Sequence, residues 1–447
     1  MTGLFAGVFG HGGIEHQVDD GAWLRALLDA EAALARAQAA CGLISAADAE
    51  AITRACVPGA VDAGAIGRAA ADGGNPVIPL VKEVTRAVGG DAGRHVHTGA
   101  TSQDIMDTAA MLVARRAGAV VLDHGAAATD ALAELAADHR ATLMAGRTLL
   151  QHALPVTFGL TAAGWLNGVG TALERLDAVL AEGAAVQLGG AAGTLASLGD
   201  DGPRVVAAFA AELGLAEPLL PWHTDRGRVA DLAGALARVS GAAGKAAGDI
   251  VLLAQTEVAE VAEAGGAGVG GSSTLPHKRN PVAAVSALAC AEQAPGLAAT
   301  LLGAQVQQYQ RAAGAWQSEW PALTHLLRVT GGAVAWLGTS LERLRVDPGR
   351  MRANLDLTGG FALAERVATD LAAELGRLPA HDLVREACAE ASESRRGLPD
   401  VLAGRLTGRR TREEIAALLD PSGYLGRSAA FTDRAIHAHH TRTAHRR

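Results

Sequence analysis

The chain has 447 residues, 49% of them hydrophobic and only 3% aromatic, and its formal net charge at pH 7 is −8. That length is sufficient for roughly two to four domains with buried cores. The acidic balance argues against a polyanionic partner, so we expect no nucleic-acid binding. The N-terminus lacks the pattern of a signal peptide and the long apolar stretches are interrupted by charge, so we expect a cytoplasmic protein that does not contact membranes.

The composition predicts helices rather than sheets. Alanine dominates long stretches, aromatic residues are scarce, and no segment shows a convincing run of alternating β-branched residues. The cysteines lie far apart without a CxxC pair, which is typical of reduced packing residues: Cys41, Cys56, Cys290 and Cys388. We therefore predict an all-α protein.

The first clear helix is expected to run to about Ala40, with Asp19 and Asp20 as possible caps before it and Gly42 to stop it. Longer helical patterns, typical of a long bundle, follow at 104–118, 124–142, 156–184, 228–264, 282–311 and 321–345. Several of these helices are apolar on most sides, so we expect a homo-oligomer that covers them. The expected organisation is an N-terminal helical domain at 1–103, a central long-helix bundle with the site segments at 104–346, and a C-terminal helical domain at 347–447.

A polar segment precedes the helix expected at 104. It reads His97-Thr-Gly-Ala-Thr-Ser-Gln-Asp104. Thr101 and Asp104 can act simply as a capping pair. The same geometry suits carboxylate binding, because hydroxyl and free N–H groups gather at a helix N-terminus. On this segment alone, both interpretations stay open.

Two further loops contain candidate residues. The segment Gly146-Arg-Thr-Leu-Leu-Gln-His-Ala-Leu-Pro155 places Gln151 and His152 before a long helix, although a lone histidine is more often structural than catalytic. The glycine-rich segment Gln187-Leu-Gly-Gly-Ala-Ala-Gly-Thr194 favours close approach of helices. The alternative is that the N–H groups of this segment line a pocket.

The most informative stretch is Gly271-Ser-Ser-Thr-Leu-Pro-His-Lys-Arg-Asn-Pro281, where hydroxyl, ammonium and carboxamide groups share a segment that its prolines keep from being helical. Lys278 is one of only three lysines among 39 Lys and Arg residues, which favours a specific role for a compact ammonium over an ordinary solvated lysine. Residues 266–271 fit G-x-G-x-x-G, but no strand is expected before them, so we predict no nucleotide site. No metal-ligand spacing is present either, since the pair His439-His440 lies in a short basic tail that we expect to be solvated.

Taken together and in this order, these segments resemble the fumarase/aspartase superfamily, whose hallmark is Gly-Ser-Ser-x-Met-Pro-x-Lys-x-Asn-Pro; here Leu275 replaces the usual methionine. Within it the chain is most similar to the 3-carboxy-cis,cis-muconate cycloisomerases, through residues 97–108, 151–155, Gly314-Ala-Trp-Gln-Ser-Glu-Trp320 and Tyr424-Leu-Gly426. The resemblance implies three helical domains, a homotetramer with active sites shared between subunits, and a small di- or tricarboxylate substrate. It implies no metal and no organic cofactor.

The resemblance also implies roles for individual residues. Ser272 matches the serine that exchanges a proton α to a carboxylate, and Lys278 and Asn280 match positions that hold the substrate. Thr101 and Ser102 match a second carboxylate-binding segment, and His152 is a further catalytic candidate. The remaining substrate-binding candidates are His97, Thr98, Gln103, Gln151, Ser273 and Arg311.

One departure from the superfamily pattern concerns the leaving group. Many members carry histidine directly after Gly-Arg-Thr, where this chain has Leu149. A carboxylate leaves unprotonated because its conjugate acid titrates near ~4, whereas hydroxide or an amine needs an acid. The sequence therefore favours interconversion of 3-carboxy-cis,cis-muconate and 4-carboxymuconolactone. The alternative is a lyase with another good leaving group, such as nitrosuccinate lyase; adenylosuccinate- or argininosuccinate-type lyases and an inactive crystallin-like relative are disfavoured.

Overall fold

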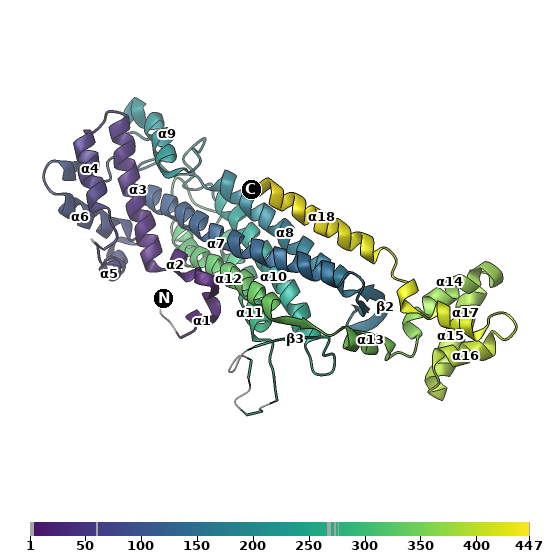
Figure 1. Cartoon of the computed structure of the whole chain (residues 1–447). Helices are drawn as coiled ribbons and strands as arrows, with labels where there is room; N and C mark the ends of the chain where they lie inside the picture. Colours follow the sequence, from purple (N-terminus) through teal and green to yellow (C-terminus); the bar gives the residue numbers. More distant parts are fainter. Residues whose placement is uncertain (1–3, 60, 266–269, 272–273, 276, 447) are drawn as a thin grey trace. The chain divides into compact units, whose positions relative to one another are not determined.

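The computed structural model describes residues 4–59, 61–265, 270–271, 274–275 and 277–446, which form two compact units. Unit 1 comprises Met1–Ala127, Thr171–Ala247 and Val285–Gly338, and unit 2 comprises Ala128–Gly170, Gly248–Ala284 and Thr339–Arg447. Almost all regular structure is helical (Figure 1), which confirms the predicted all-α class. The division into three helical domains stays a prediction.

Five long helices have residues in both units. They are α7 (Ser102–Asp138), α8 (Phe158–Gly183), α10 (Gly227–Leu253), α11 (Val282–Gly303) and α12 (Ala315–Arg343). The helices expected at 104–118 and 124–142 are one continuous helix, α7. Its interior glycines are explained by packing in unit 1, because a Cβ on Gly118 or Gly125 would lie only 2.3 or 2.5 Å from leucine side chains of α8.

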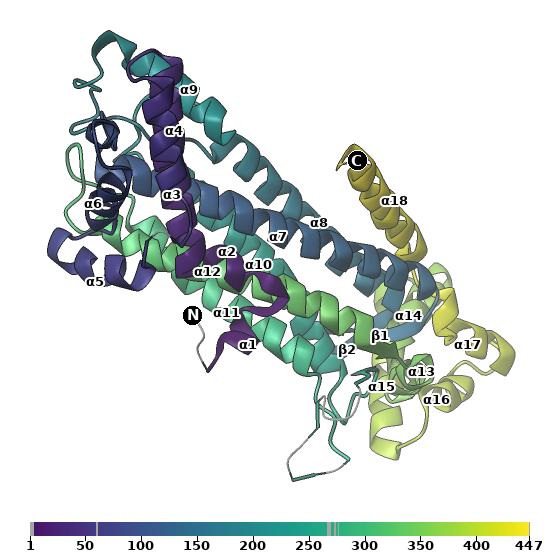
Figure 2. The same ribbon diagram turned by 60° about the vertical axis from the view of Figure 1, so that its left-hand side comes forward.

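Seven of the described α-helices lie wholly in unit 1. They are α1 (Ala6–Phe9), α2 (Glu15–Val18), α3 (Asp20–Ala40), α4 (Ala46–Ala55), α5 (Ala63–Gly73), α6 (Val77–Val88) and α9 (Gly202–Leu213). The helix expected to run to about Ala40 is confirmed as α3. Of the two possible caps, Asp19 caps it, by accepting a hydrogen bond from the Ala22 N–H at 2.8 Å. The leucines of α3 are buried, and the helix packs against α4 and α9 (Figure 2).

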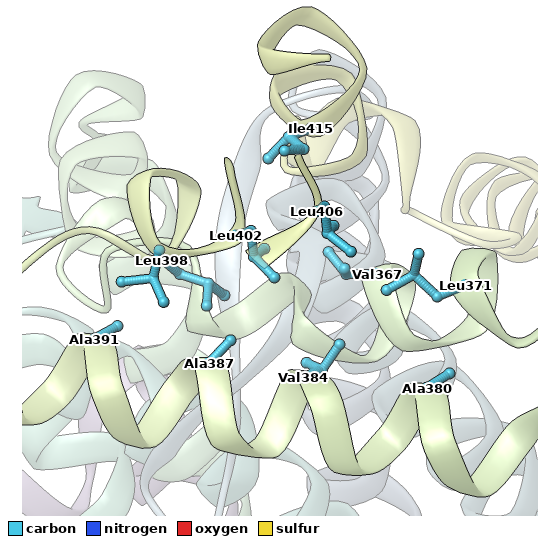
Figure 3. Packing of buried hydrophobic residues seen from close by; sticks show 11 residues of the cluster. Val367, Leu371, Ala380, Val384, Ala387, Ala391, Leu398, Leu402, Leu406 and Ile415 are labelled. Atoms are coloured by element: carbon cyan, nitrogen blue, oxygen red, sulfur yellow. The ribbon is translucent and has the colours of Figure 1, made fainter. Parts of the chain in front are cut away.

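Unit 2 contains two small antiparallel sheets and the C-terminal helices. Its strands are β1 (Leu143–Thr148), β2 (Gln151–Thr157), β3 (Val261–Glu263) and β4 (Leu344–Val346). Its own helices are α13 (Pro348–Asp356), α14 (Ala364–Leu375), α15 (Arg377–Ser394), α16 (Leu398–Arg405), α17 (Arg412–Leu418) and α18 (Ser428–Arg446). Helices α14 to α17 share a core that includes Val384, Leu402 and Ile415 (Figure 3).

Three expected helix boundaries differ from the structure. The pattern at 228–264 ends at Leu253, because residues 261–263 form β3 instead. The pattern at 282–311 ends at Gly303. Helix α12 begins at Ala315 and carries Pro321 inside its second turn, whereas we expected this proline to begin the helix. In each case the apolar periodicity identified the helix but not the residue at which it ends.

The C-terminal run is not a solvated tail over the described residues. It belongs to α18, and the side chain of His439 is buried. Its Nε2 lies 2.8 Å from Oδ1 of Asp130 on α7, within unit 2. His439 therefore holds α18 in place rather than lying incidentally in a basic tail.

Helix α11 is the one described helix that is long and apolar enough, by length and composition, to cross a membrane. In the single chain, 44% of the residues in the apolar stretch of this helix are buried. One such helix is weak support for a membrane span, because core helices of folded proteins pass the same test.

Candidate functional site

In unit 1 the polar segment at residues 97–104 is fixed by one buried carboxylate. Asp104, which is 0% exposed, accepts hydrogen bonds at Oδ1 from Gly189 N (2.9 Å) and His223 Nε2 (2.6 Å). Its Oδ2 accepts from Gly190 N (2.9 Å) and Thr101 N (2.9 Å). Four donors satisfy both oxygens of the carboxylate. Asp104 therefore does more than cap α7, because it joins the start of this helix to the glycine turn.

The glycine turn takes part in this arrangement through its backbone. A Cβ on Gly189 would lie 2.8 Å from His223 Cε1, so the close approach requires glycine. The carbonyl oxygens of Gly190 and Ala191 both accept from Nη2 of Arg311, at 2.8 Å each. The N–H groups of Gly189 and Gly190 are thus used inside the protein, as the favoured prediction of close packing requires.

The turn brings two of the predicted substrate-binding elements together. Asp104 links Thr101 to the turn, because its Oδ2 accepts from the N–H groups of both Thr101 and Gly190. Arg311 contacts the turn directly, by donating to its carbonyl oxygens. The Nε of Arg311 is buried and has no hydrogen-bond partner among the described residues. Hydroxyl groups, a helix N-terminus and a guanidinium are suited to a carboxylate.

Residues His97 and Thr98 are held by helix α3. His97 Nδ1 lies 2.6 Å from Oε1 of Glu31, and Nε2 of Gln38 donates to the carbonyl of Thr98 at 2.6 Å. The backbone of His97 has a positive φ of 62°. Burial opposes a charge on His97, but the adjacent Glu31 carboxylate raises its pKa above the usual value. The geometry leaves Nε2 as the ring nitrogen of His97 that is not engaged with Glu31.

Arg226, Asp107 and Glu319 form a buried charge triad, in which Asp107 lies on α7. The guanidinium of Arg226 donates to Asp107 at 2.8 and 3.1 Å and to Glu319 at 3.0 and 2.5 Å. Burial opposes the charge of Arg226, yet its two carboxylate partners raise its pKa. Burial raises the pKa of Glu319 despite its contact with Arg226. Gln103 is fully buried beside the triad and donates to Asp107 Oδ2 at 3.2 Å and to the carbonyl of His223 at 2.8 Å.

Unit 1 also contains a cavity of about 420 Å³. Trp23, Met106, Trp320 and His325 are among its lining residues. None of the predicted site residues lines it. We therefore base the candidate site on the hydrogen-bonded cluster around Asp104 rather than on this cavity.

In unit 2 the segment at residues 146–155 is a hairpin rather than a loop that leads directly into a helix. Strands β1 and β2 pair with Arg147 opposite His152, and Leu149 and Leu150 form the two-residue turn. Both turn residues have positive φ values, 50° and 63°, and they are 97% and 71% exposed. The sequence did not predict this hairpin, since such turns normally contain Asn-Gly or Asp-Gly.

The base of the hairpin is held by a buried carboxylate. Glu260 is 0% exposed and accepts from Nη1 and Nη2 of Arg147 at 3.0 and 2.6 Å. Asn354 Nδ2 donates to the same carboxylate at 2.8 Å. His152 is half-buried, and its Nδ1 has no hydrogen-bond partner among the described residues. Burial, and then the positive charge of Arg147, lower the pKa of His152, so its imidazole is neutral at pH 7.

The polar loop is closed at its base. Asn280 donates to the carbonyl of Gly270 from its backbone N–H (2.8 Å) and from Nδ2 (3.1 Å). A Cβ on Gly270 would lie 2.5 Å from Asn280 O, and φ is +66°, so glycine is required here. Lys278 is exposed. Ser272, Ser273 and part of the G-x-G-x-x-G stretch lie outside the described residues.

Glu263 fixes the chain that leaves this loop. Its two oxygens accept from the N–H groups of Ala283 (3.0 Å) and Ala284 (2.8 Å) at the start of α11, and from Ser340 Oγ (2.6 Å). A carboxylate at this position also complements the positive end of the helix dipole. Glu260, just before strand β3, and Glu263, the last residue of that strand, therefore hold the hairpin and the end of the loop.

Sequence reasoning missed five charged or titratable partners. These are His223, Arg226, Glu260, Glu263 and Glu319. Several of them lie about 90 to 120 positions from their contacts, so no local spacing reveals them. The available signal was weaker, because only Glu263 and Glu319 are charged residues within a strand or helix, whereas the other three lie in connecting segments. Within the described part of the chain, no three His, Cys, Asp or Glu side chains are grouped to hold a metal ion.

Comparison with known proteins places these features in context. The family model described as Lyase matches residues 14–296, and the model described as Adenylosuccinate lyase C-terminus matches residues 360–435. A 3-carboxy-cis,cis-muconate cycloisomerase from Bradyrhizobium diazoefficiens is 47% identical over 441 residues, which cover 98% of this chain and 98% of that protein.

Two further matches are similarly extensive. A nitrosuccinate lyase from Streptomyces davaonensis is 46% identical over 451 residues, which cover 97% of this chain and 94% of that protein. The crystal structure of a 3-carboxy-cis,cis-muconate lactonizing enzyme from Pseudomonas putida matches with a TM-score of 0.92 and 40% identity, covering 98% of this chain and 99% of that one.

Proposed function

The chain belongs to the lyase family of the fumarase/aspartase superfamily, and we propose that it is a cycloisomerase that interconverts 3-carboxy-cis,cis-muconate and 4-carboxymuconolactone. The observation that carries this proposal is the 47% identity with a cycloisomerase over 98% of both chains. The site chemistry agrees with it, because groups suited to carboxylates surround the start of α7. A substrate with three carboxylates needs several such groups.

The reaction needs one proton transfer and one carbon–oxygen bond. In the lactonising direction, a substrate carboxylate adds to a double bond while a protein group protonates the adjacent carbon. The reverse direction removes that proton, and the carbon–oxygen bond breaks to release the carboxylate. Charge accumulates on the carboxylate next to the reacting carbon, so donors and a cation near its oxygens lower the barrier.

We assign the proton transfer to Ser272, with His152 as the second candidate. Lys278 and Asn280 are assigned to the substrate, and the compact ammonium of Lys278 to a single carboxylate oxygen. Thr98, Thr101, Ser102 and Arg311 are assigned to a second carboxylate. The imidazole of His152 is neutral and its Nδ1 has no hydrogen-bond partner among the described residues, so it is able to accept a proton.

The leaving group supports a reaction that needs no strong acid. Leu149 replaces the histidine that many superfamily members carry after Gly-Arg-Thr, and its side chain is 97% exposed on the hairpin turn. Expulsion of a carboxylate requires no proton from the enzyme. A second candidate function is nitrosuccinate lyase, because a relative with that activity is 46% identical and nitrite also leaves without protonation.

The proposal includes the assembly and location of the enzyme. We infer a homotetramer in the cytoplasm with active sites shared between subunits. The assembly is supported by helices such as α11, which keep apolar residues exposed in the single chain, among them Val282, Val285 and Leu302. Burying such faces against other copies is the usual reason for their exposure. No metal or organic cofactor is assigned to the reaction.

An absorbance assay tests the proposed reaction. Mixing the enzyme with 3-carboxy-cis,cis-muconate should decrease the ultraviolet absorbance, since lactonisation consumes the conjugated diene. Ser272→Ala should lower the rate by roughly 10²-fold or more, as expected on removal of an acid–base group. Ser394→Ala, at an exposed position near the end of α15, is the matched control and should leave the rate unchanged.

The assay separates the two candidate functions. Unchanged absorbance together with nitrite release from nitrosuccinate would transfer the function to the second candidate. Wild-type turnover by the Ser272→Ala variant would move the proton transfer to another residue.

A further inference from the structure

The C-terminal part of unit 2 contains a cavity between helices α14 and α15. Its volume is about 680 Å³, which is within the range of small-molecule sites. We call it the α14–α15 cavity; it is lined by Ala364, Glu365, Ala368, Thr369, Ala372, Arg377, His381, Val384, Arg385 and Cys388. None of the residues assigned to the proposed reaction is among them.

One wall of the cavity is formed by a row of small side chains on α14. Ala364, Ala368 and Ala372 are spaced four residues apart, so they lie on one face of the helix. The same alanines pack at the edge of the core that Figure 3 shows, where Val384 is a core residue. The core of this region therefore stops at side chains too short to fill the space between the two helices.

The floor contributed by α15 is also apolar. Val384 and Cys388 are one turn apart on α15. Burial raises the pKa of the Cys388 thiol, which is therefore uncharged at neutral pH. Alanine, valine and thiol side chains together give the cavity an apolar interior.

The rim of α15 is basic. Arg377, His381 and Arg385 also follow a four-residue spacing and line the same cavity. Arg385 donates to Asp382 at 3.1 Å, whereas Arg377 has no acidic partner among the described residues. On α14, the carboxylate of Glu365 accepts from the hydroxyl of Tyr424 at 2.9 Å. The free positive charge at the rim is thus that of Arg377.

We propose that the α14–α15 cavity binds a small amphipathic organic anion, with its apolar body against the alanine row and its carboxylate or sulfonate at Arg377. The charge at the rim selects an anion, and the alanine and valine walls select an apolar body. The size of the cavity fits a single small molecule rather than a protein segment. This ligand site is separate from the chemistry of the proposed reaction.

Fluorescence titration with 1-anilinonaphthalene-8-sulfonate tests this inference, because the dye is itself an aromatic monoanion. The whole wild-type protein should give a saturable rise in fluorescence. Ala368→Trp fills the cavity and should abolish that rise. Arg377→Gln with Arg385→Gln should weaken binding by roughly tenfold, since both cations at the rim are removed.

A matched control separates this site from general dye binding. Arg409→Gln removes an exposed arginine of the same unit that does not line the cavity, so it should not change the affinity. Thermal unfolding and circular dichroism show whether each variant is folded, and the arginine variants, which change exposed positions, test the proposal even if the tryptophan variant does not fold.

Two outcomes would overturn the inference. One is a titration that is the same for the wild type and for the folded arginine or tryptophan variants. The other is displacement of the dye by an acidic peptide but not by octanoate, which would assign the surface to an acidic protein segment. Displacement by octanoate in the wild type, with no displaceable dye in the tryptophan variant, is the result we expect.

Discussion

The two groups of candidate site residues differ in how firmly the protein holds them. Around Asp104 and Arg226 in unit 1, fully buried charges meet several partners at 2.5 to 3.2 Å. In unit 2 Lys278 and the turn with Leu149 are exposed, and the carboxylates of Glu263 and Glu260 hold only the chain at the bases of this loop and this turn.

This difference separates positioning from reaction. Preorganised groups bind a carboxylate without having to reorganise, and that suits the segment at the start of α7. A loop that is fixed at its base and exposed at Lys278 can close over a substrate without disturbing a core. We therefore expect substitutions of the buried charges in the first group to change stability and substitutions in the second group to change turnover.

The strongest test of this contrast is Arg226→Gln. The change leaves two buried carboxylates, Asp107 and Glu319, without their shared cation, so the free energy of unfolding should fall by about 3–5 kcal/mol. Urea unfolding followed by circular dichroism measures the loss. Arg204→Gln is the control, because its pair with Asp201 is exposed and should contribute less than about 1 kcal/mol. Equal losses for the two variants would remove the distinction between the regions.

The second test, Lys278→Arg, keeps the charge but changes its shape. A planar guanidinium does not reproduce a compact ammonium at one carboxylate oxygen, so kcat/KM should fall at least ~10-fold, which corresponds to ~1.4 kcal/mol. Stability should not change, since Lys278 is exposed. Lys82→Arg, at another exposed lysine, should leave both quantities unchanged. Wild-type kinetics for Lys278→Arg would mean that Lys278 supplies only diffuse charge.

The smallest expected effect concerns the hairpin turn. Leu149→Asn together with Leu150→Gly introduces the pair that a turn with two positive φ values prefers, so stability should rise by about 1 kcal/mol. The midpoint of urea unfolding measures the change. Leu378→Asn, also at an exposed leucine of unit 2, should give no such gain. A loss of stability in the turn variant would show that the leucines make contacts that offset their strained backbone.

The sequence predicted the features that repeat locally. Helical periodicity identified α3 and all five long helices, and the spacing of polar residues singled out the segments at 97–104 and 271–281. It could not predict the β1–β2 hairpin, because Leu149 and Leu150 give no turn signal. Nor could it pair Asp104 with His223, since that contact joins residues 119 positions apart.

The central claim is that this enzyme acts where the leaving group needs no proton. Steady-state kinetics with a panel of substrates tests it most directly: 3-carboxy-cis,cis-muconate, nitrosuccinate, malate, aspartate, argininosuccinate and adenylosuccinate. A strongly basic leaving group needs general-acid help worth about 10²–10⁴ in rate, and Leu149 cannot provide it. We predict turnover of 3-carboxy-cis,cis-muconate and none of the last four compounds. Efficient formation of fumarate from any of those four would contradict the account.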